Sequence, residues 1–217
     1  MCGRYSQHHT TNDLVDRFAV QLVLEPVTER YNVAPSQPVP VITAQGARCL
    51  DAYRWGLVPS WAKDPGSGII NARAETLAEK PSFKAALARR RCLIPADGFF
   101  EWKKEENGRQ PMHIRLKDGD LFAFAGLWEV WESPEGTPLH TCAIVTVAPN
   151  DVLVPIHNRM PAILRPEDEA AWLDPAIKGV EALELLRSYP AERMEAYPVS
   201  RRVNAPVVDD AACILPA

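Results

Sequence analysis

The stretch DLFAFAGLWEVW, residues 120–131, and the stretch HTCAIVTVAP, residues 140–149, decide the fold of this chain. Both runs are rich in aromatic and β-branched residues, which favour strands. The polar segment ESPEGTP at 132–138 separates them, and its glycine and prolines suit a tight connection. We therefore expect a β-hairpin.

More strands are expected on either side of this hairpin. Residues 39–43 follow a proline-rich loop, and the stretch at 50–62 reads as a strand that ends in a turn at Pro59. In RRCLIPADGFFEWKK, residues 90–104, an apolar run meets a tight Asp-Gly turn and then an aromatic strand. A last strand is expected at about 195–199.

Short helices are expected between the strands. Residues 10–24 are predicted to form one, because Thr10 can cap it with Asp13 three positions on. Its apolar face would carry Leu14, Phe18 and Leu22. Three further helices are predicted from Pro81, over 167–173 and over 179–188. Because strands and helices mix without regular βαβ spacing, we predict an α+β fold with a mostly antiparallel, barrel-like β core and short flanking helices.

Length and composition indicate one globular unit. The chain has 217 residues, 47% of them hydrophobic and 24% charged, and no repeat or long linker divides it. We therefore expect a single domain over 1–217. No apolar run approaches the roughly 20 residues of a membrane helix, and the N-terminus lacks an apolar signal sequence. We expect no membrane association and a cytoplasmic protein, near the nucleoid in a bacterium or nuclear in a eukaryote.

Charge and cysteine usage exclude some classes of function. A net charge of −4 argues against nonspecific coating of nucleic acid, although a local basic cleft is compatible with it. The five cysteines are widely spaced and form no CxxC or Cys/His cluster, so reduced thiols are expected, without a disulfide framework or zinc site. No GxGxxG, P-loop or metal signature is present, and we expect no cofactor.

Cys2 is the first candidate for chemistry. A free cysteine is usually a buried small hydrophobe, and that interpretation suits a residue entering a first strand. Removal of Met1 would instead leave Cys2 with an α-amine and a thiol on neighbouring carbons. Their ordinary pKa values, roughly 8 and roughly 8.5, leave a reactive fraction at neutral pH. Both interpretations stay open at this point.

Two polar residues stand in apolar or turn segments. Glu101 in PADGFFEW either faces water at a strand end or lies in an apolar pocket, where burial would raise its pKa toward the range useful for proton transfer. His157 in VPIHNRMPAIL is either a structural hydrogen-bonding group or an acid–base residue. Neither segment decides between its alternatives.

Two further segments carry groups that can bind phosphate or bases. In GIINARAET, Asn71 and Arg73 would point to one face of a strand, and Arg can fork onto a phosphate; a strand-end amide beside a surface arginine is the other interpretation. In RWGLVPSWAK, aromatic and basic residues interleave as in single-strand binding surfaces. We expect Trp55 to be core and Trp61 to be the better candidate for contact.

Eight motifs follow one another along the chain: MCGRY, RYNVAPSQ, RWGLVPSWAKD, INARAET, KPSF, RRCLIPADGFFEW, FAGLWEVW and IHNRMPAIL. In this order and at these intervals they resemble the SRAP (SOS response-associated peptidase) family of abasic-site shielding proteins. The likeness extends from residue 2 to about residue 204.

The resemblance implies that Cys2, after removal of Met1, bonds covalently to an abasic site in single-stranded DNA. The implied catalytic residues are Cys2, Asn71, Glu101 and His157. The implied DNA-binding residues are Arg4, Arg73, Arg159, Trp61 and Pro35. The replication machinery is a further expected partner, and a monomer the expected state.

The implied chemistry suits these residue types. The Cys2 amine would attack the C1′ aldehyde of the opened deoxyribose to give a Schiff base, and the thiol would close a thiazolidine ring. Glu101 and His157 would relay protons, and a weak lyase activity through the Schiff base is expected.

Two other functions compete with this one. A thiol peptidase would use Cys2 as nucleophile, His157 as base and Asn71 to orient it. A noncatalytic single-stranded DNA-binding module would keep Cys2 as a structural residue and would show no preference for abasic sites.

Overall fold

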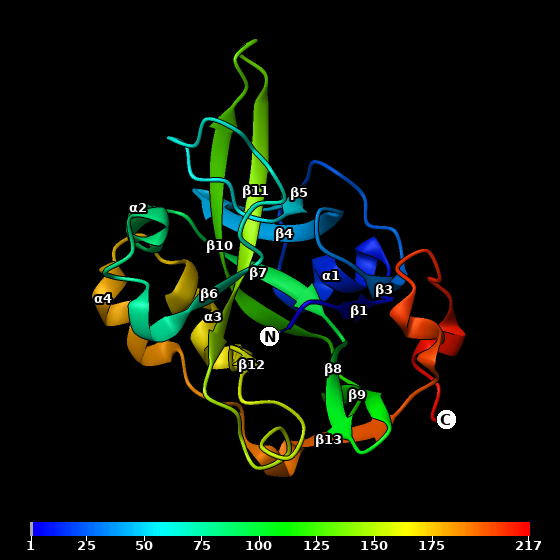
Figure 1. Ribbon diagram of the computed structural model, residues 1–217. Coiled ribbons are helices and arrows are strands. Elements are labelled where there is room, and N and C mark those ends of the chain that lie inside the picture. The colour runs from blue at the N-terminus through cyan, green and yellow to red at the C-terminus, as the bar shows by residue number, and fades with distance from the viewer. Residues whose placement is uncertain (1) are drawn as a thin grey trace.

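The computed structural model describes residues 2–217 as a closed barrel, a second sheet and short helices around them (Figure 1). Five strands form the barrel: β4 (Pro38–Gln45), β5 (Ala47–Trp55), β7 (Arg91–Ala96), β10 (Phe122–Glu132) and β11 (Pro138–Val147). Five others form the antiparallel second sheet: β1 (Tyr5–Gln7), β3 (Arg30–Val33), β8 (Gly98–Glu105), β9 (Gly108–Leu116) and β13 (Met194–Pro198). The predicted α+β class with a barrel-like core is confirmed.

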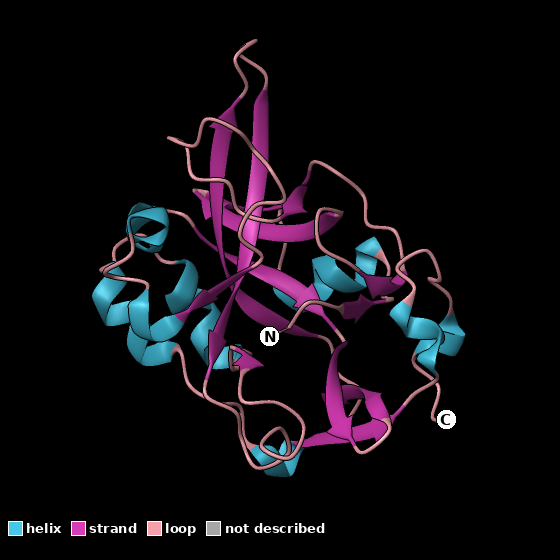
Figure 2. Cartoon of the chain, viewed as in Figure 1, coloured by secondary structure: helices cyan, strands magenta, loops and turns pink. Residues whose placement is uncertain are grey.

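Shorter elements complete the chain (Figure 2). Three two- or three-residue strands join the barrel sheet: β2 (Leu22–Val23), β6 (Asn71–Arg73) and β12 (Met160–Pro161). The helices are α1 (Thr11–Phe18), α2 (Pro81–Arg89), α3 (Pro166–Leu173) and α4 (Gly179–Ala182). Within residues 2–217, no helix is long and apolar enough to cross a membrane.

The expected hairpin closes the barrel. Strands β10 and β11 pair antiparallel from Gly126 opposite Ile144 to Glu132 opposite Pro138. On its other edge β11 pairs with β5 in parallel, and this contact completes the ring. Aromatic and aliphatic side chains of β7, β10 and β11 fill the core, because all of β7 and most of β10 and β11 are buried.

Aromatic packing fixes the N-terminal strand against the barrel. The Tyr5 ring of β1 meets Trp55 of β5 edge-on at a centroid distance of 5.3 Å, and Phe124 of β10 at 5.7 Å. Such pairs contribute about 0.5–1.5 kcal/mol beyond area burial. The predicted burial of Trp55 is confirmed. Residues 2–4, which lead into Tyr5, are therefore held beside the barrel.

The first predicted helix is correct at its start and wrong at its end. Thr10 caps α1 with the expected capping box, but α1 ends at Phe18 rather than at 24. Ala19 adopts a left-handed conformation with φ of 50°, and Leu22 pairs with β5 as part of β2. The sheet edge thus overrides the helical periodicity. The helix expected at 179–188 is also shorter, because only Gly179–Ala182 is α-helical.

The expected tight turn at Asp97 and Gly98 is a bend at Asp97, and Gly98 already begins β8. Strand β7 pairs within the barrel, whereas β8 pairs with β1 and β9 in the second sheet. The chain therefore passes from one sheet to the other at Asp97. This crossing brings β8 alongside β1 and places the aromatic strand next to the N-terminus.

Candidate active site

Four separate segments meet beside the N-terminus, close to β6, β8 and β12 in Figure 1. Cys2 precedes β1, Asn71 opens β6, Glu101 lies in β8, and His157 stands just before β12. The ladder between β1 and β8 aligns two of them: Tyr5 pairs with Phe99, and the Phe100 amide donates to the Arg4 carbonyl at 2.9 Å. Beyond these contacts, the chain before β1 continues to Cys2, and β8 continues to Glu101.

The Cys2 side chain is fully buried. Burial raises the pKa of its thiol strongly, and the nearby charge of Glu101 raises it further. The thiol is thus held in its protonated form, with the Arg4 carbonyl as a weak acceptor at 3.8 Å. The burial expected for Cys2 is confirmed, its role in chemistry stays a prediction, and the expected removal of Met1 lies outside the described residues.

Asn71 binds the backbone of Cys2 directly. Its Nδ2 donates to the Cys2 carbonyl at 2.7 Å, while strand β6 is itself held by parallel pairing of Asn71 opposite Ile144. The other amide atom, Oδ1, is buried and accepts no hydrogen bond from residues 2–217. A buried acceptor without a donor is costly, so this atom offers a place for an N–H group next to Cys2.

Glu101 is buried and does not face water, so of its two interpretations the water-facing one is wrong. Only 3% of its surface is exposed, because Glu101 lies in the first half of β8, whose residues are all buried. Burial raises the pKa of Glu101, and the neighbouring His157 only partly opposes this rise. A carboxyl group with a raised pKa can both give and take a proton near neutral pH.

His157 completes the cluster. Its Nδ1 lies 3.9 Å from Glu101 Oε1 and accepts a hydrogen bond from the Arg159 amide at 3.0 Å. The same nitrogen lies 3.2 Å from the Arg159 carbonyl oxygen, so the backbone of Arg159 holds the ring in place. The side chain is 26% exposed, so one edge of the ring reaches solvent while the other faces Glu101.

Three arginines were expected to bind phosphate, and two of them lie together. Arg73 is exposed at the end of β6 opposite Thr146, and Arg159 donates to the Thr146 carbonyl at 2.6 Å. The two Nη atoms of Arg159 also donate hydrogen bonds to the carboxylate oxygens of Glu75, at 2.6 and 2.9 Å. Nothing in the sequence indicates the contact of Arg159 with Glu75, since 84 positions separate them.

Arg4 is in a different environment. It is buried, and its Nη1 donates to the side chain of Asn32 at 2.8 Å and to the Val203 carbonyl at 2.7 Å. Burial lowers the pKa of this guanidinium. Arg4 therefore ties the N-terminal segment to the C-terminal part of the chain, and its contact with phosphate stays a prediction.

The two residues expected to flank DNA lie in loops. Trp61 is 67% exposed, in a loop whose ends are joined by the bridge of Leu57 with Ile69. Gly68, with φ of +70°, is needed at the base of this loop, because a Cβ there would lie 2.1 Å from the Gly56 carbonyl oxygen. Pro35 is half-buried between β3 and β4. Their roles toward DNA stay predictions.

The architecture and much of the sequence match known proteins. The family model for SOS response associated peptidase (SRAP) matches residues 1–206. The abasic site processing protein YoqW of Bacillus subtilis is 49% identical over 214 residues, covering 95% of both chains. The abasic site processing protein YedK of Escherichia coli is 36% identical over 213 residues, covering 94% of both. A crystal structure of a Bacteroides thetaiotaomicron protein superposes with a TM-score of 0.90 at 30% identity, covering all of both chains.

Proposed function

The chain belongs to the SOS response associated peptidase (SRAP) family, and we propose that it processes abasic sites by bonding covalently to them through Cys2. The names of its relatives in Bacillus subtilis and Escherichia coli support the substrate class. The observation that carries the proposal is the hydrogen bond of 2.7 Å from Asn71 to the Cys2 carbonyl, next to the buried carboxyl of Glu101. These contacts hold residue 2 beside a group that can exchange protons, which supports chemistry at the nitrogen and sulfur of Cys2.

The reaction begins once Met1 has been removed and the Cys2 amine is free. The amine nitrogen adds to the C1′ aldehyde of the opened deoxyribose and gives a carbinolamine. Loss of its hydroxyl as water leaves a Schiff base, and the sulfur then bonds to C1′ to close a five-membered thiazolidine. Aldehyde and aminothiol thus give thiazolidine and one water.

Each neighbouring side chain has a role in these reaction steps. Glu101, whose pKa is raised by burial, supplies the proton to the departing hydroxyl and takes one from the thiol as the ring closes. His157, with one ring edge exposed, exchanges the proton of the sugar oxygen during ring opening. Asn71 holds the Cys2 carbonyl, and its Oδ1 accepts from the amine.

The thiol environment argues for attack by the amine first. A thiol peptidase needs a thiol whose pKa is lowered, so that the thiolate is available at neutral pH. Burial has the opposite effect on Cys2 and raises its pKa. A weak lyase activity follows from the same Schiff base, since that intermediate permits elimination of the 3′ phosphate before the ring closes.

We extend the proposal to the form of the DNA and to the state of the protein. Single-stranded DNA is the target, with Arg73 and Arg159 on the phosphates and Trp61, which is 67% exposed, stacking on a base. One SRAP domain over 1–217, a monomeric state and contact with the replication machinery complete the proposal. Comparing single-stranded with duplex abasic oligonucleotides tests the first of these points.

Intact mass spectrometry with an abasic oligonucleotide tests the covalent step. Wild type is expected to lack Met1 and to gain the oligonucleotide mass minus one water, as a band that resists heat on a denaturing gel. Cys2→Ser and Cys2→Ala are expected to lose this stable adduct, while Cys49→Ala, a half-buried cysteine on β5, keeps it. A heat-stable adduct with Cys2→Ala would overturn the thiazolidine mechanism.

A further inference from the structure

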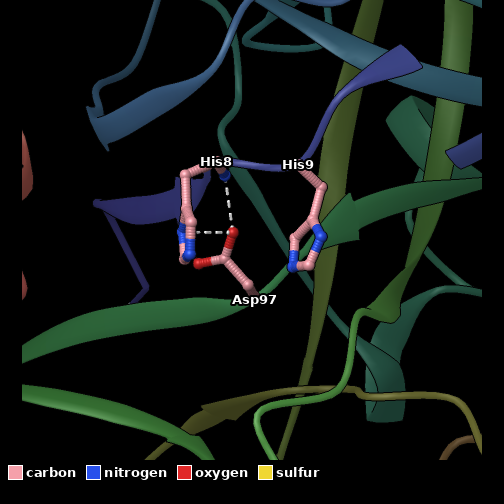
Figure 3. A group of neighbouring side chains, drawn as sticks. All are labelled: His8, His9 and Asp97. Carbon is pink, nitrogen blue, oxygen red and sulfur yellow. Dashed lines mark hydrogen bonds and ion pairs between the residues drawn. The ribbon is translucent and has the colours of Figure 1, made fainter. Parts of the chain in front are cut away.

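A second group of polar side chains lies at the other end of β1. The chain leaves this strand after Gln7 and continues through His8 and His9 toward α1. Asp97, at the crossing between β7 and β8, lies against them. In Figure 3 the two imidazole rings stand on either side of the Asp97 carboxylate. Their ligand atoms all lie within 4.8 Å of one another.

The arrangement is unusual for adjacent residues. Neighbouring side chains of a strand point to opposite faces, but the rings of His8 and His9 stack at a centroid distance of 5.2 Å and an angle of 26°. Both residues lie beyond the end of β1, where this alternation no longer applies. The Asp97 oxygen Oδ2 lies 2.8 Å from His8 Nδ1. Two imidazoles and one carboxylate therefore converge at the surface of the second sheet.

Surrounding contacts orient this group. The Ser6 hydroxyl donates to Asp97 Oδ1 at 2.5 Å and lies 3.1 Å from His113 Nε2. The His8 ring stacks on Tyr31 at 5.2 Å and 15°. Bound metal ions are commonly held by ligands that are themselves oriented through such outer hydrogen bonds and packing. Asp97 is only 4% exposed, so its carboxylate cannot rotate freely.

We propose that His8, His9 and Asp97 bind a divalent transition-metal ion of the nickel, copper and zinc class. Two imidazoles and one carboxylate are a ligand set for such ions, whereas magnesium and calcium prefer oxygen ligands. Bonds of about 2.1 Å at right angles would put neighbouring ligand atoms about 3 Å apart, close to the 2.8 Å between His8 and Asp97. Binding requires His8 to give up its Nδ1 proton and the His9 ring to rotate inward.

A metal ion bound at this site would hold the end of β1 in place. The ion would join the end of this strand and the following loop to the crossing between β7 and β8. Cys2 precedes β1 at its other end, and β8 carries Glu101. The bound ion would therefore stabilise the pairing of the two strands next to the proposed reaction centre. The inference itself does not depend on the proposed function, since metal binding is measured without DNA.

Isothermal titration of Zn²⁺ and Ni²⁺ into the metal-free full chain tests the proposal. One ion per chain is expected, with a rise of about 5 °C in Tm at a hundredfold excess over Kd. His9→Ala is the decisive variant, because the His9 ring is 28% exposed and its nearest carboxylate, on Asp13, is 3.9 Å away. Its loss should weaken binding at least tenfold without unfolding the protein, and His8→Ala should do the same.

Two controls separate this site from other donors. His140→Ala removes an exposed histidine on β11 and should leave binding unchanged. Cys2→Ala should also leave it unchanged, and a Co²⁺ spectrum should show no thiolate band. Equal binding by wild type and His9→Ala, or loss of binding in Cys2→Ala, would overturn the proposal. Absence of binding at millimolar metal would overturn it as well, and would leave the ion pair of His8 with Asp97 as the role of the cluster.

Discussion

The two ends of β1 present the same type of group, a buried carboxyl, in two different environments. Glu101 near the Cys2 end is 3% exposed, and Asp97 near the His8 end is 4% exposed. Asp97 accepts from the Ser6 hydroxyl at 2.5 Å and from the His8 amide at 2.6 Å, with the His8 ring at 2.8 Å. Glu101 has His157 at 3.9 Å, and burial dominates its pKa, which is raised.

This difference shows that equal burial leads to different properties. A carboxylate surrounded by short donors is fixed in place, and its hydrogen bonds join β1, β7 and β8. A carboxyl whose burial outweighs its partners is instead prepared to exchange a proton. Changes at the Glu101 end should therefore affect the reaction, whereas changes at the Asp97 end should affect stability.

The largest expected effect is that of Glu101→Gln on the rate of adduct formation. Loss of the proton donor should slow the reaction about 10²- to 10⁴-fold in a single-turnover gel assay. The raised pKa means that ionising Glu101 costs stability as pH rises above the ordinary carboxyl range. Glutamine removes this cost, so Tm at pH 8 should stay equal or increase.

A matched control is Glu129→Gln on the barrel. Glu129 is also buried and is paired with Arg90 at 2.6 Å, so its change should lower Tm and leave the rate unaltered. If Glu101→Gln formed the adduct at the wild-type rate, the proposed distinction between a reactive and a structural end of β1 would be wrong.

We expect the loss of stability at low pH to arise mainly at the Asp97 end of β1. Burial lowers the pKa of His113 to about 4, so the unfolded chain binds a proton more readily than the native protein between pH 6.5 and 4. Stability should therefore fall by about 3 kcal/mol as pH decreases through this window. Urea unfolding of wild type and His113→Gln across this pH range, with EDTA present, measures this fall in stability.

The difference between the two stability curves isolates the His113 contribution from that of the carboxylates. His113→Gln should lose this part of the pH dependence. Parallel curves for the two proteins would show that His113 is not held neutral.

Ser6→Ala should have an intermediate effect on stability. It leaves Asp97 Oδ1 without its donor at 2.5 Å and should cost about 2 kcal/mol in urea unfolding. Ser188→Ala removes an exposed hydroxyl bound to the Ala148 carbonyl and should cost less than about 1 kcal/mol. Equal losses would contradict the structural role given to the Asp97 end.

The smallest expected effect is a gain in DNA binding by Glu75→Gln. This carboxylate occupies the Arg159 fork that a phosphate would use under the proposed function, and the Arg159 hydrogen bond lowers the pKa of Glu75. Exposed pairs contribute up to about 1 kcal/mol, so single-strand affinity should increase about threefold. Glu192→Gln, an equal change of charge at an exposed position, should have a smaller effect at the same salt concentration. No difference between them would exclude competition at Arg159.

Much of the fold could be predicted from local patterns. The hairpin of β10 with β11, the capped start of α1 and the helix from Pro81 all follow from side-chain type and turn chemistry over a few residues. The end of α1 could not, because Leu22 pairs with β5, more than twenty residues away in the sequence. The crossing at Asp97 could not be predicted either, because it depends on which sheet β8 joins.

The sequence by itself determined the motifs, their order and hence the family, together with the residue types needed for aminothiol chemistry. Only the tertiary structure decided that Glu101 is buried, that Arg159 meets Glu75 and that the ligand atoms of His8, His9 and Asp97 lie within 4.8 Å of one another. The physical reason is that side-chain type and local spacing act within a few residues. Burial, pKa and ligand geometry instead arise from groups on separate strands, which come together only when the barrel and the second sheet pack against β1.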